Sequence, residues 1–160
     1  MIIQPVSRIV QIEIIDYAIG FTYGYGNWAT SWLAKTNKTT MKKILIADDE
    51  HKILMSLEYS FRKQGYEVFI ARDGTEVLDL LKTITPDVIL LDIMMPNLDG
   101  YSTLNEIKTM ENLNHSKVIF LSAKTNPKDI EKGLELGADA YVTKPYSIKK
   151  LIQQIEEMLE

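Results

Sequence analysis

The sequence predicts an α/β fold in which a parallel sheet is covered by helices on both faces. Three observations support this prediction. Five short apolar segments recur after residue 41, helix-length amphipathic segments separate them, and the central segments are apolar at every position. A strand that is apolar throughout is typical of a parallel sheet buried on both faces. Strands that alternate with helices in this way are joined by right-handed crossovers.

The predicted strands are short, and most end next to polar residues. They are KILIA (43–47), YEVFIA (66–71), DVILLD (87–92), KVIFLSA (117–123) and AYVTK (140–144). The second alternates between apolar and polar positions more than the central ones do. This alternation favours a place at the edge of the sheet, where one side of the strand is less covered.

Each strand is followed by a segment whose apolar residues keep helical spacing, and we expect these residues to face the sheet. The second helix is expected to run from Asp73, Ser147 is expected to cap the fifth, and Pro127 precedes the fourth. Gly65 and Gly137 mark the ends of the first and fourth helices. The expected core positions are Leu54, Leu57 and Phe61; Val77, Leu78 and Leu81; Tyr101, Leu104 and Ile107; Ile130 and Leu134; and Ile148, Leu151, Ile152, Ile155 and Leu159.

Composition limits the classes of function. A chain of 160 residues with 46% hydrophobic residues can bury one core of substantial size. Residues 41–160 hold 15 Lys and Arg against 20 Asp and Glu, a net charge of −5, which argues against direct binding of nucleic acid. The chain has no cysteine, which excludes disulfides, thiolate zinc sites and thiol nucleophiles. A cytoplasmic location is compatible with this composition.

Residues 1–40 are expected to be a poorly structured N-terminal extension, and residues 41–160 to form the folded domain. The segment 17–34 carries no charge, but three glycines and several Thr, Ser and Asn residues dilute its apolar character. We therefore expect no membrane insertion. The segment KTNKTT (35–40) is typical of a linker, and Met41 is a candidate alternative translational start.

Polar side chains are predicted at the carboxyl ends of four strands. Asp48 and Asp49 follow the first strand, Asp92 ends the third, Ser122 lies at the end of the fourth and Lys144 ends the fifth. Each has an ordinary structural interpretation when taken alone: acids cap helices, serines bond to nearby backbone, and lysines extend to solvent. In doubly wound sheets, however, ligands bind at this edge, where the strand order reverses.

Together, these residues predict a cation site. If the first and third strands are neighbours, Asp48, Asp49 and Asp92 converge, and three close carboxylates raise one another's pKa unless a cation joins them. Oxygen ligands without thiols or imidazoles favour Mg²⁺. With Ser122 and Lys144 added, the site has the groups needed for phosphoryl transfer onto a carboxylate, with Asp92 as the attacking group.

The motifs ILIADDE, VILLDIMMPNLDG, VIFLSA and YVTKPYS, in this order, resemble the receiver domain of response regulators in two-component systems. The resemblance covers about residues 42–159. It implies a flavodoxin-like doubly wound sheet of five parallel strands in the order 2-1-3-4-5, flanked by five helices. It also implies that Asp92 accepts a phosphoryl group, and that Asp48, Asp49, Asp92 and the backbone carbonyl of Met94 hold Mg²⁺.

The same resemblance assigns further roles. Lys144 would pair with the phosphoryl oxygens, Ser122 would move to hydrogen-bond them, and Tyr141 would change exposure as Ser122 moves. The peptide bond from Lys144 to Pro145 would be cis. A sensor histidine kinase or phosphotransfer protein would supply the phosphoryl group, and residues 127–159 would bind a downstream protein target. Because the sequence ends with the last predicted helix, we expect a single-domain regulator in a phosphorelay, not an enzyme.

Two other functions are compatible with a sheet of this layer order. A Mg²⁺-dependent hydrolase could use Asp92 as a transient nucleophile, but Met94, two residues later, supplies no acid or base. A flavodoxin-like cofactor binder would need a loop after the first strand that cradles phosphate, whereas the acids of that loop, DDE at 48–50, would repel it. Fold alone does not separate these functions from signalling.

Overall fold

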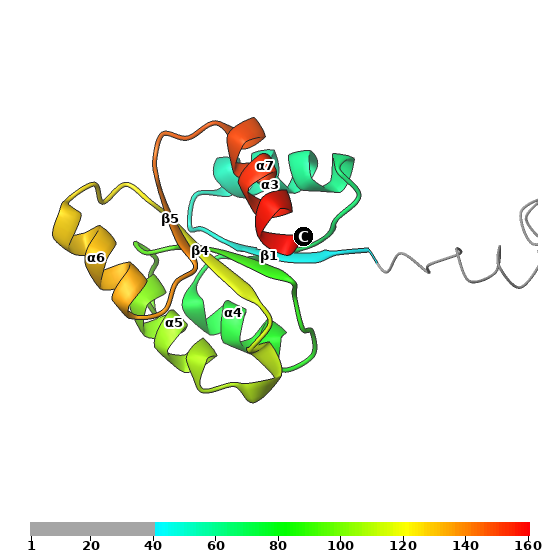
Figure 1. Cartoon of the computed structure of the whole chain (residues 1–160). Coiled ribbons are helices and arrows are strands. Elements are labelled where there is room, and N and C mark those ends of the chain that lie inside the picture. Colours follow the sequence, from blue (N-terminus) through cyan, green and yellow to red (C-terminus); the bar gives the residue numbers. More distant parts are fainter. Residues whose placement is uncertain (1–40) are drawn as a thin grey trace, which may run out of the picture. The chain divides into compact units, whose positions relative to one another are not determined.

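The computed structural model describes residues 41–160, so the predictions for residues 1–40 lie outside the described residues. The described part forms one five-stranded sheet in the order β2-β1-β3-β4-β5, and all of its strand pairs are parallel (Figure 1). The predicted fold class and strand order are therefore confirmed. In chain order, the elements are β1 (Lys43–Ala47), α3 (His51–Lys63), β2 (Glu67–Ala71), α4 (Gly74–Leu81), β3 (Val88–Asp92), α5 (Gly100–Lys108), the short 3-10 helix η1 (Glu111–Leu113), β4 (Lys117–Ser122), α6 (Pro127–Glu135), β5 (Ala140–Thr143) and α7 (Ile148–Leu159).

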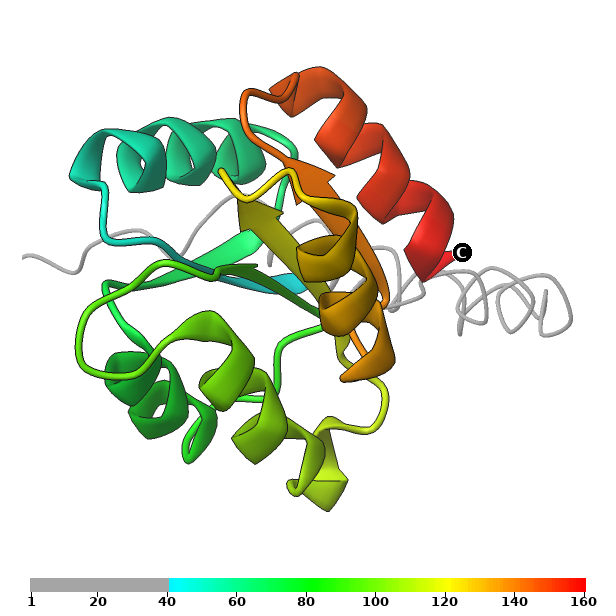
Figure 2. The same cartoon turned by 90° about the vertical axis from the view of Figure 1, so that its left-hand side faces the viewer.

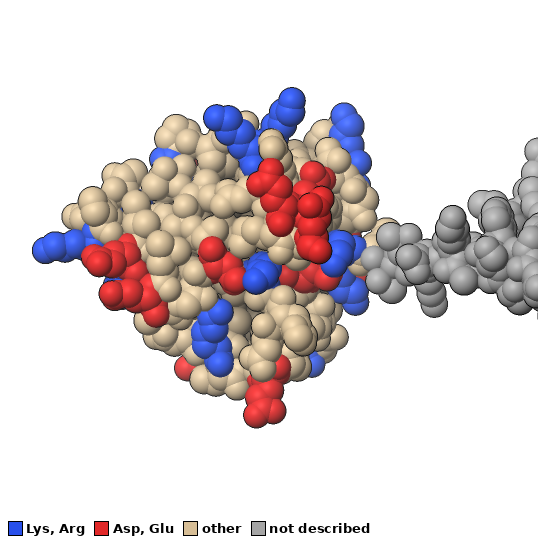
Figure 3. All heavy atoms as spheres, viewed as in Figure 1, with Lys and Arg blue, Asp and Glu red and all other residues tan. Residues whose placement is uncertain are grey.

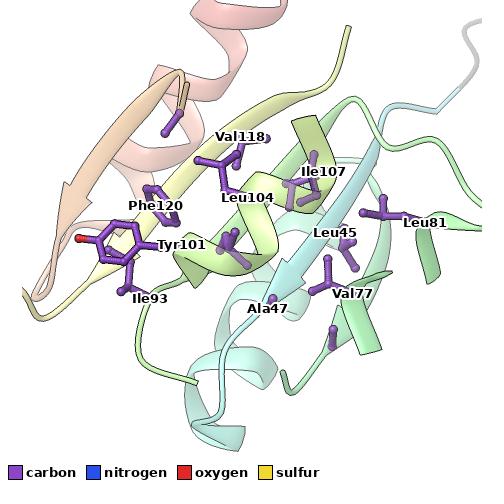
Figure 4. Close-up of a cluster of buried hydrophobic side chains, with 14 of the residues drawn as sticks. Leu45, Ala47, Val77, Leu81, Ile93, Tyr101, Leu104, Ile107, Val118 and Phe120 are labelled. Atoms are coloured by element: carbon purple, nitrogen blue, oxygen red, sulfur yellow. The ribbon is translucent and has the colours of Figure 1, made fainter. Parts of the chain in front are cut away.

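The helices cover both faces of the sheet. Helices α3 and α7 lie on one face, and α4, α5 and α6 lie on the other (Figures 1 and 2). Every residue of the central strand β3 is buried, which explains why its sequence is apolar up to its final position. The core under α4 and α5 includes Leu45, Ala47, Val77, Leu81, Ile93, Tyr101, Leu104, Ile107, Val118 and Phe120 (Figure 4).

The predicted helix boundaries follow from local chemistry. Asp73 accepts a hydrogen bond from the Glu76 backbone N–H and caps α4, and Ser147 caps α7 in the same way. Gly65 and Gly137 follow α3 and α6 with φ of 87° and 97°, a region that glycine enters without steric cost. Between residues 41 and 160, no helix is long and apolar enough to cross a membrane.

One predicted core position is wrong. Leu134 keeps helical spacing with Ile130, but its side chain is 45% exposed, and Gly133 is the residue of α6 that is buried. A Cβ on Gly133 would lie 3.0 Å from the ring of Tyr141 and 3.1 Å from that of Phe120. Aromatic rings from β4 and β5 already fill the space under α6, so the helix approaches them through its smallest residue.

Strand register brings the predicted site residues to one edge. Ala47 pairs with Leu91, so the residues that follow them, Asp48 and Asp92, emerge side by side from neighbouring strands. Ser122 pairs with Thr143, which places Lys144 just beyond the end of β4. The carboxyl edge of the sheet therefore collects side chains from the ends of four strands that are far apart in the sequence.

Candidate functional site

Two acids at the carboxyl edge of the sheet are almost fully buried. Asp48 is 1% exposed and Asp92 is 3% exposed. In each carboxylate, one oxygen accepts a hydrogen bond from its own loop: Asp48 Oδ1 from the Glu50 N–H at 2.9 Å, and Asp92 Oδ2 from the Met94 N–H at 2.8 Å. The loops thus fix the direction of both carboxylates and leave one oxygen of each for other partners.

Lys144 binds those remaining oxygens. Its Nζ lies 2.6 Å from Asp48 Oδ2 and 3.2 Å from Asp92 Oδ1, and its side chain is only 15% exposed. Because β4 lies between β5 and β3, the long side chain reaches across the end of β4 to make these contacts. The Lys144–Pro145 peptide bond is cis, as the sequence resemblance implied. The structure thus brings Lys144, Asp48 and Asp92 together.

The charges of this cluster do not balance. Burial raises the pKa of Asp92, the positive charge of Lys144 opposes that rise, and the negative charge of Asp48 adds to it, so the pKa stays above its usual value. Burial alone would lower the pKa of Lys144, but its hydrogen bond to Asp48 and the charge of Asp92 prevail and raise it. The single ammonium group of Lys144 is therefore the counter-ion of two buried carboxylates, those of Asp48 and Asp92.

Asp49 does not join this pair as a third buried acid. Its side chain is exposed, and among residues 41–160 no three His, Asp or Glu side chains gather as a ready metal cluster. Mg²⁺ in proteins commonly uses one or two carboxylates, together with waters and phosphate oxygens, and needs no cage of protein ligands. The hard oxygens of Asp48 and Asp92 fit that chemistry. The roles of Asp49 and of the Met94 carbonyl remain predictions.

Ser122 and Tyr141 both form hydrogen bonds with the backbone of Lys124. Ser122 is fully buried, and its Oγ accepts a hydrogen bond from the Lys124 N–H at 3.2 Å. The Tyr141 hydroxyl donates to the Lys124 carbonyl oxygen at 3.0 Å. The segment between β4 and α6 is therefore tied both to the end of β4 and to β5. Movement of Ser122 would release one of these two ties.

Tyr101, which the sequence predicts only as a core position, also makes polar contacts with α6. Its hydroxyl donates to the Asp129 carbonyl oxygen of α6 at 3.0 Å, and the Nζ of Lys132 lies 4.2 Å from its ring centroid. Burial, with smaller effects from Tyr141 and Asp129, raises the pKa of Tyr101 to about 12. Its ring also packs edge-on against Phe120 with centroids 5.4 Å apart. Tyr101 therefore ties α5 to the first turn of α6.

The surface seen in Figure 3 carries charges of both signs. Lysine and arginine side chains are interspersed with aspartate and glutamate over this face of residues 41–160. Residues 41–160 also contain exposed ion pairs, such as Lys82 with Asp79 at 2.6 Å. Direct nucleic-acid binding relies on clustered cations, and its absence stays a prediction from the net charge of residues 41–160.

The strand order and the charged cluster at the carboxyl edge of the sheet define a flavodoxin-like α/β domain with its site at the point where the strand order reverses. The sequence model of one family, described as the response regulator receiver domain, matches residues 44–156. The chain belongs to this family. Receiver domains act in two-component signalling, and phosphorylation and Mg²⁺ binding are general features of the family.

Solved structures of receiver domains are similar to this chain. The receiver domain of the Francisella response regulator 1452 is 40% identical, with a TM-score of 0.69 over 74% of this chain and 96% of that one. The chemotaxis response regulator CheY4 of Vibrio cholerae is 28% identical, with a TM-score of 0.71 over 75% of this chain and 100% of that one. The signal receiver domain of a signal transduction histidine kinase from Syntrophus aciditrophicus is 31% identical, with a TM-score of 0.69 over 74% of this chain and 89% of that one.

Proposed function

We propose that this protein accepts a phosphoryl group on Asp92 with the help of Mg²⁺, and that phosphorylation changes its binding to a partner protein. The observation that carries the proposal is the position of Lys144 Nζ, 3.2 Å from Asp92 Oδ1 and 2.6 Å from Asp48 Oδ2. A buried acid that faces an ammonium group and a second acid can attack a phosphoryl group while the ammonium binds its oxygens.

The residues divide the tasks of this mechanism. An oxygen of Asp92 attacks the phosphorus and forms the new O–P bond, while the donor's bond to phosphorus breaks and the histidine nitrogen, or acetate from acetyl phosphate, leaves with the bonding electrons. Lys144 binds the phosphoryl oxygens, and Ser122 donates a hydrogen bond to them. Asp48, Asp49, Asp92 and the backbone carbonyl of Met94 would hold Mg²⁺, which supplies positive charge against the phosphoryl oxygens. The domain promotes the phosphorylation of its own Asp92 and the later hydrolysis of that aspartyl phosphate, and in this proposal it is a signalling domain and not an enzyme.

The charge change can be transmitted through Ser122. Phosphorylation adds a charge of about −1.5 to −2 and three acceptor oxygens next to Asp48. When Ser122 turns towards them, its Oγ gives up the Lys124 N–H, to which it now lies at 3.2 Å. Lys124 then remains tied to Tyr141, so the change reaches β5 and α6. We propose that residues 127–159 present this change to a downstream protein target.

The phosphoryl donor in this proposal is a sensor histidine kinase or a phosphotransfer protein, and the site of action is the cytoplasm. Met94 is 58% exposed beside Asp92, and Lys124 lies just beyond Ser122. We expect substitutions at either position to change the rate of dephosphorylation and to leave phosphorylation largely intact, as a time course of phosphoprotein decay would show. Decay at the wild-type rate in both variants would contradict this assignment.

The direct test is incubation with Mg²⁺ and acetyl phosphate, followed by intact mass measurement. We expect a Mg²⁺-dependent gain of one phosphoryl group in wild type and in Asp87→Asn, which alters an acid just before β3, at the opposite end of the strand. We expect no gain in Asp92→Asn. A gain that persists in Asp92→Asn would refute the role of Asp92. A folded wild-type protein that binds Mg²⁺ without gaining mass would favour phosphate-independent binding of a partner.

A further inference from the structure

The loop that follows Asp92 is attached to a turn from another part of the chain. We name residues 93–99 the acceptor loop, because they connect β3 to α5 and include Met94. The Asn97 side-chain amide donates to Asp73 Oδ2 at 2.5 Å, and the Gly74 N–H donates to the Leu98 carbonyl oxygen at 3.1 Å. Asp73 is the N-cap of α4, and Gly74 is the first residue of that helix. Two hydrogen bonds therefore join the acceptor loop to the start of α4.

Asn97 is held in an uncommon backbone conformation at this contact. Its φ is 60°, and the Leu98 N–H closes a tight turn onto the Pro96 carbonyl oxygen at 2.7 Å. Asparagine is among the few residues that enter the left-handed region at low cost. Glycine would accept the same backbone conformation but has no amide to offer Asp73. The residue at 97 thus satisfies both the backbone and the side-chain contact.

The carboxylate of Asp73 is also held in one orientation, because each of its oxygens accepts a hydrogen bond. Its side chain is 8% exposed, and its other oxygen, Oδ1, accepts the Glu76 N–H at 2.9 Å as the cap of α4. The Glu76 backbone N–H and the Asn97 amide together lower the pKa of Asp73. A Cβ on Gly74 would collide with Thr103 Oγ1 and lie 2.7 Å from the Leu98 carbonyl oxygen. The turn therefore fits closely over the acceptor loop and cannot shift without moving it.

The other hydrogen bonds of the acceptor loop act within the loop and its ends. The Met94 N–H binds Asp92 Oδ2 at 2.8 Å, and the Gly100 N–H binds the Ile93 carbonyl oxygen at 3.0 Å. These bonds shape the loop locally but do not fix it against the rest of the domain. Two contacts with the start of α4 do so: the Gly74 N–H on the Leu98 carbonyl oxygen, and the Asp73–Asn97 hydrogen bond, which is the one made by side chains and lies three residues beyond Met94.

We propose that Asp73 and Asn97 are positioning residues for the chemistry at Asp92. Their hydrogen bond holds the acceptor loop, and with it the Met94 carbonyl, in the geometry that Mg²⁺ binding and phosphoryl transfer require. This inference rests on the function proposed above. A displacement of a reacting group by about 1 Å can cost a hundredfold in rate, so a loop that keeps only the Gly74–Leu98 backbone contact with α4 would support a slower reaction.

A swap of the two side chains tests this role. In Asn97→Asp, two carboxylates face each other and the hydrogen bond is lost, while Asp remains compatible with the left-handed backbone. In the double variant Asp73→Asn/Asn97→Asp, an amide at 73 donates to a carboxylate at 97, and the net charge equals that of wild type. Asp73→Asn completes the double-mutant cycle. Ser116→Ala serves as a matched control, because Ser116 Oγ binds the Pro86 carbonyl oxygen at the amino end of the sheet, away from the loop.

The cycle is measured by Mg²⁺ titration calorimetry, by the initial rate of phosphorylation from acetyl phosphate, and by hydrogen exchange of the loop amides. We expect Asn97→Asp to weaken Mg²⁺ binding and slow phosphorylation by roughly tenfold, with faster exchange at Leu98 and Gly100. The double variant should return both quantities to within about twofold of wild type. Ser116→Ala should lower stability while leaving Mg²⁺ affinity and phosphorylation rate unchanged.

Two results would overturn the proposal. One is an Asn97→Asp variant that loses stability as Ser116→Ala does but keeps wild-type Mg²⁺ affinity and rate, since the pair would then only cap α4. The other is a double variant that remains as impaired as Asn97→Asp. If wild type itself neither binds Mg²⁺ nor gains a phosphoryl group, the proposed function fails first, and that outcome is distinguishable because it appears before any substitution is made.

Discussion

The two ends of the sheet both carry acids, but their charges are balanced in different ways. At the amino end, Asp139 accepts the Val118 N–H at 2.9 Å and pairs with Lys117 Nζ at 3.0 Å. Asp87 makes the same two kinds of contact. It pairs with Lys42 Nζ at 3.3 Å, and it accepts a hydrogen bond from the Lys43 backbone N–H at 2.7 Å. Each acid there has its own lysine, and all four side chains are partly exposed.

At the carboxyl end, two buried acids share one lysine, which also lies 3.8 Å from the exposed Glu50. Asp48 and Asp92 are only 2% and 4% exposed in their side chains, and both pair with Lys144. The chemical groups are the same as at the amino end, but burial and the ratio of charges differ. Paired, exposed charges stabilise the ends of strands, whereas an excess of buried negative charge leaves room for a cation or for a change in Lys144 partners.

The largest effect is expected from removal of the shared lysine. Lys144→Met leaves two buried carboxylates without a counter-ion, which should cost about 3 kcal/mol of unfolding free energy in the absence of Mg²⁺. Lys117→Met breaks a partly exposed pair and should cost less than about 1 kcal/mol. Urea unfolding of both variants in EDTA measures the difference. Equal losses would mean that burial at the carboxyl end has no energetic consequence.

Mg²⁺ should stabilise the carboxyl end alone. At about 100 times its dissociation constant, an ion that binds only the folded state adds about 2.7 kcal/mol to the unfolding free energy. We expect this gain in wild type and in Asp87→Asn, and a much smaller gain in Asp92→Asn. Thermal unfolding across a Mg²⁺ titration gives the values. The same gain in Asp92→Asn and wild type would place the ion elsewhere.

The fold could be predicted from sequence because its signals are local. The apolar run of β3, the capping side chain of Asp73 and the glycines at 65 and 137 each report a conformation of neighbouring residues. Leu134 shows where such reasoning ends. Helical spacing indicates one apolar face, but the rings of β4 and β5 decide which residue of α6 can approach the sheet, and the sequence does not reveal how much space they fill.

For the site, the sequence predicts which residues lie at the carboxyl ends of the strands, but not which contacts their side chains make. Register follows from the fold, so Asp48 and Asp92 were expected to be neighbours. The double pairing of Lys144 depends on how far its side chain reaches across β4, and the exposure of Asp49 depends on the path of one loop. Contacts of Tyr101 with α6 join surfaces that only the packed structure brings together.

The smallest expected effect is on stability, when an Asp→Asn substitution at Asp92, the last residue of β3, is compared with one at Asp87, just before β3. Burial raises the pKa of Asp92, so the folded protein holds this proton more tightly than the unfolded chain does. Stability is then fully present below the usual Asp pKa of about 3.9 and is lost as the pH rises through the raised pKa. Asp92→Asn removes this loss and leaves Lys144 with Asp48 as its one buried partner, beside the exposed Glu50 at 3.8 Å, which approaches the one-to-one balance of the amino end.

Without Mg²⁺ at neutral pH, Asp92→Asn should therefore be more stable than wild type by about 1 kcal/mol, the ordinary scale of a single substitution. The difference should vanish towards pH 4. Asp87→Asn, which only gives up its pair with Lys42, should be neutral or slightly destabilised. Urea unfolding at several pH values in EDTA compares the three proteins. If Asp92→Asn is the less stable protein at neutral pH, Lys144 already balances both acids, and the two ends of the sheet differ in burial but not in net charge.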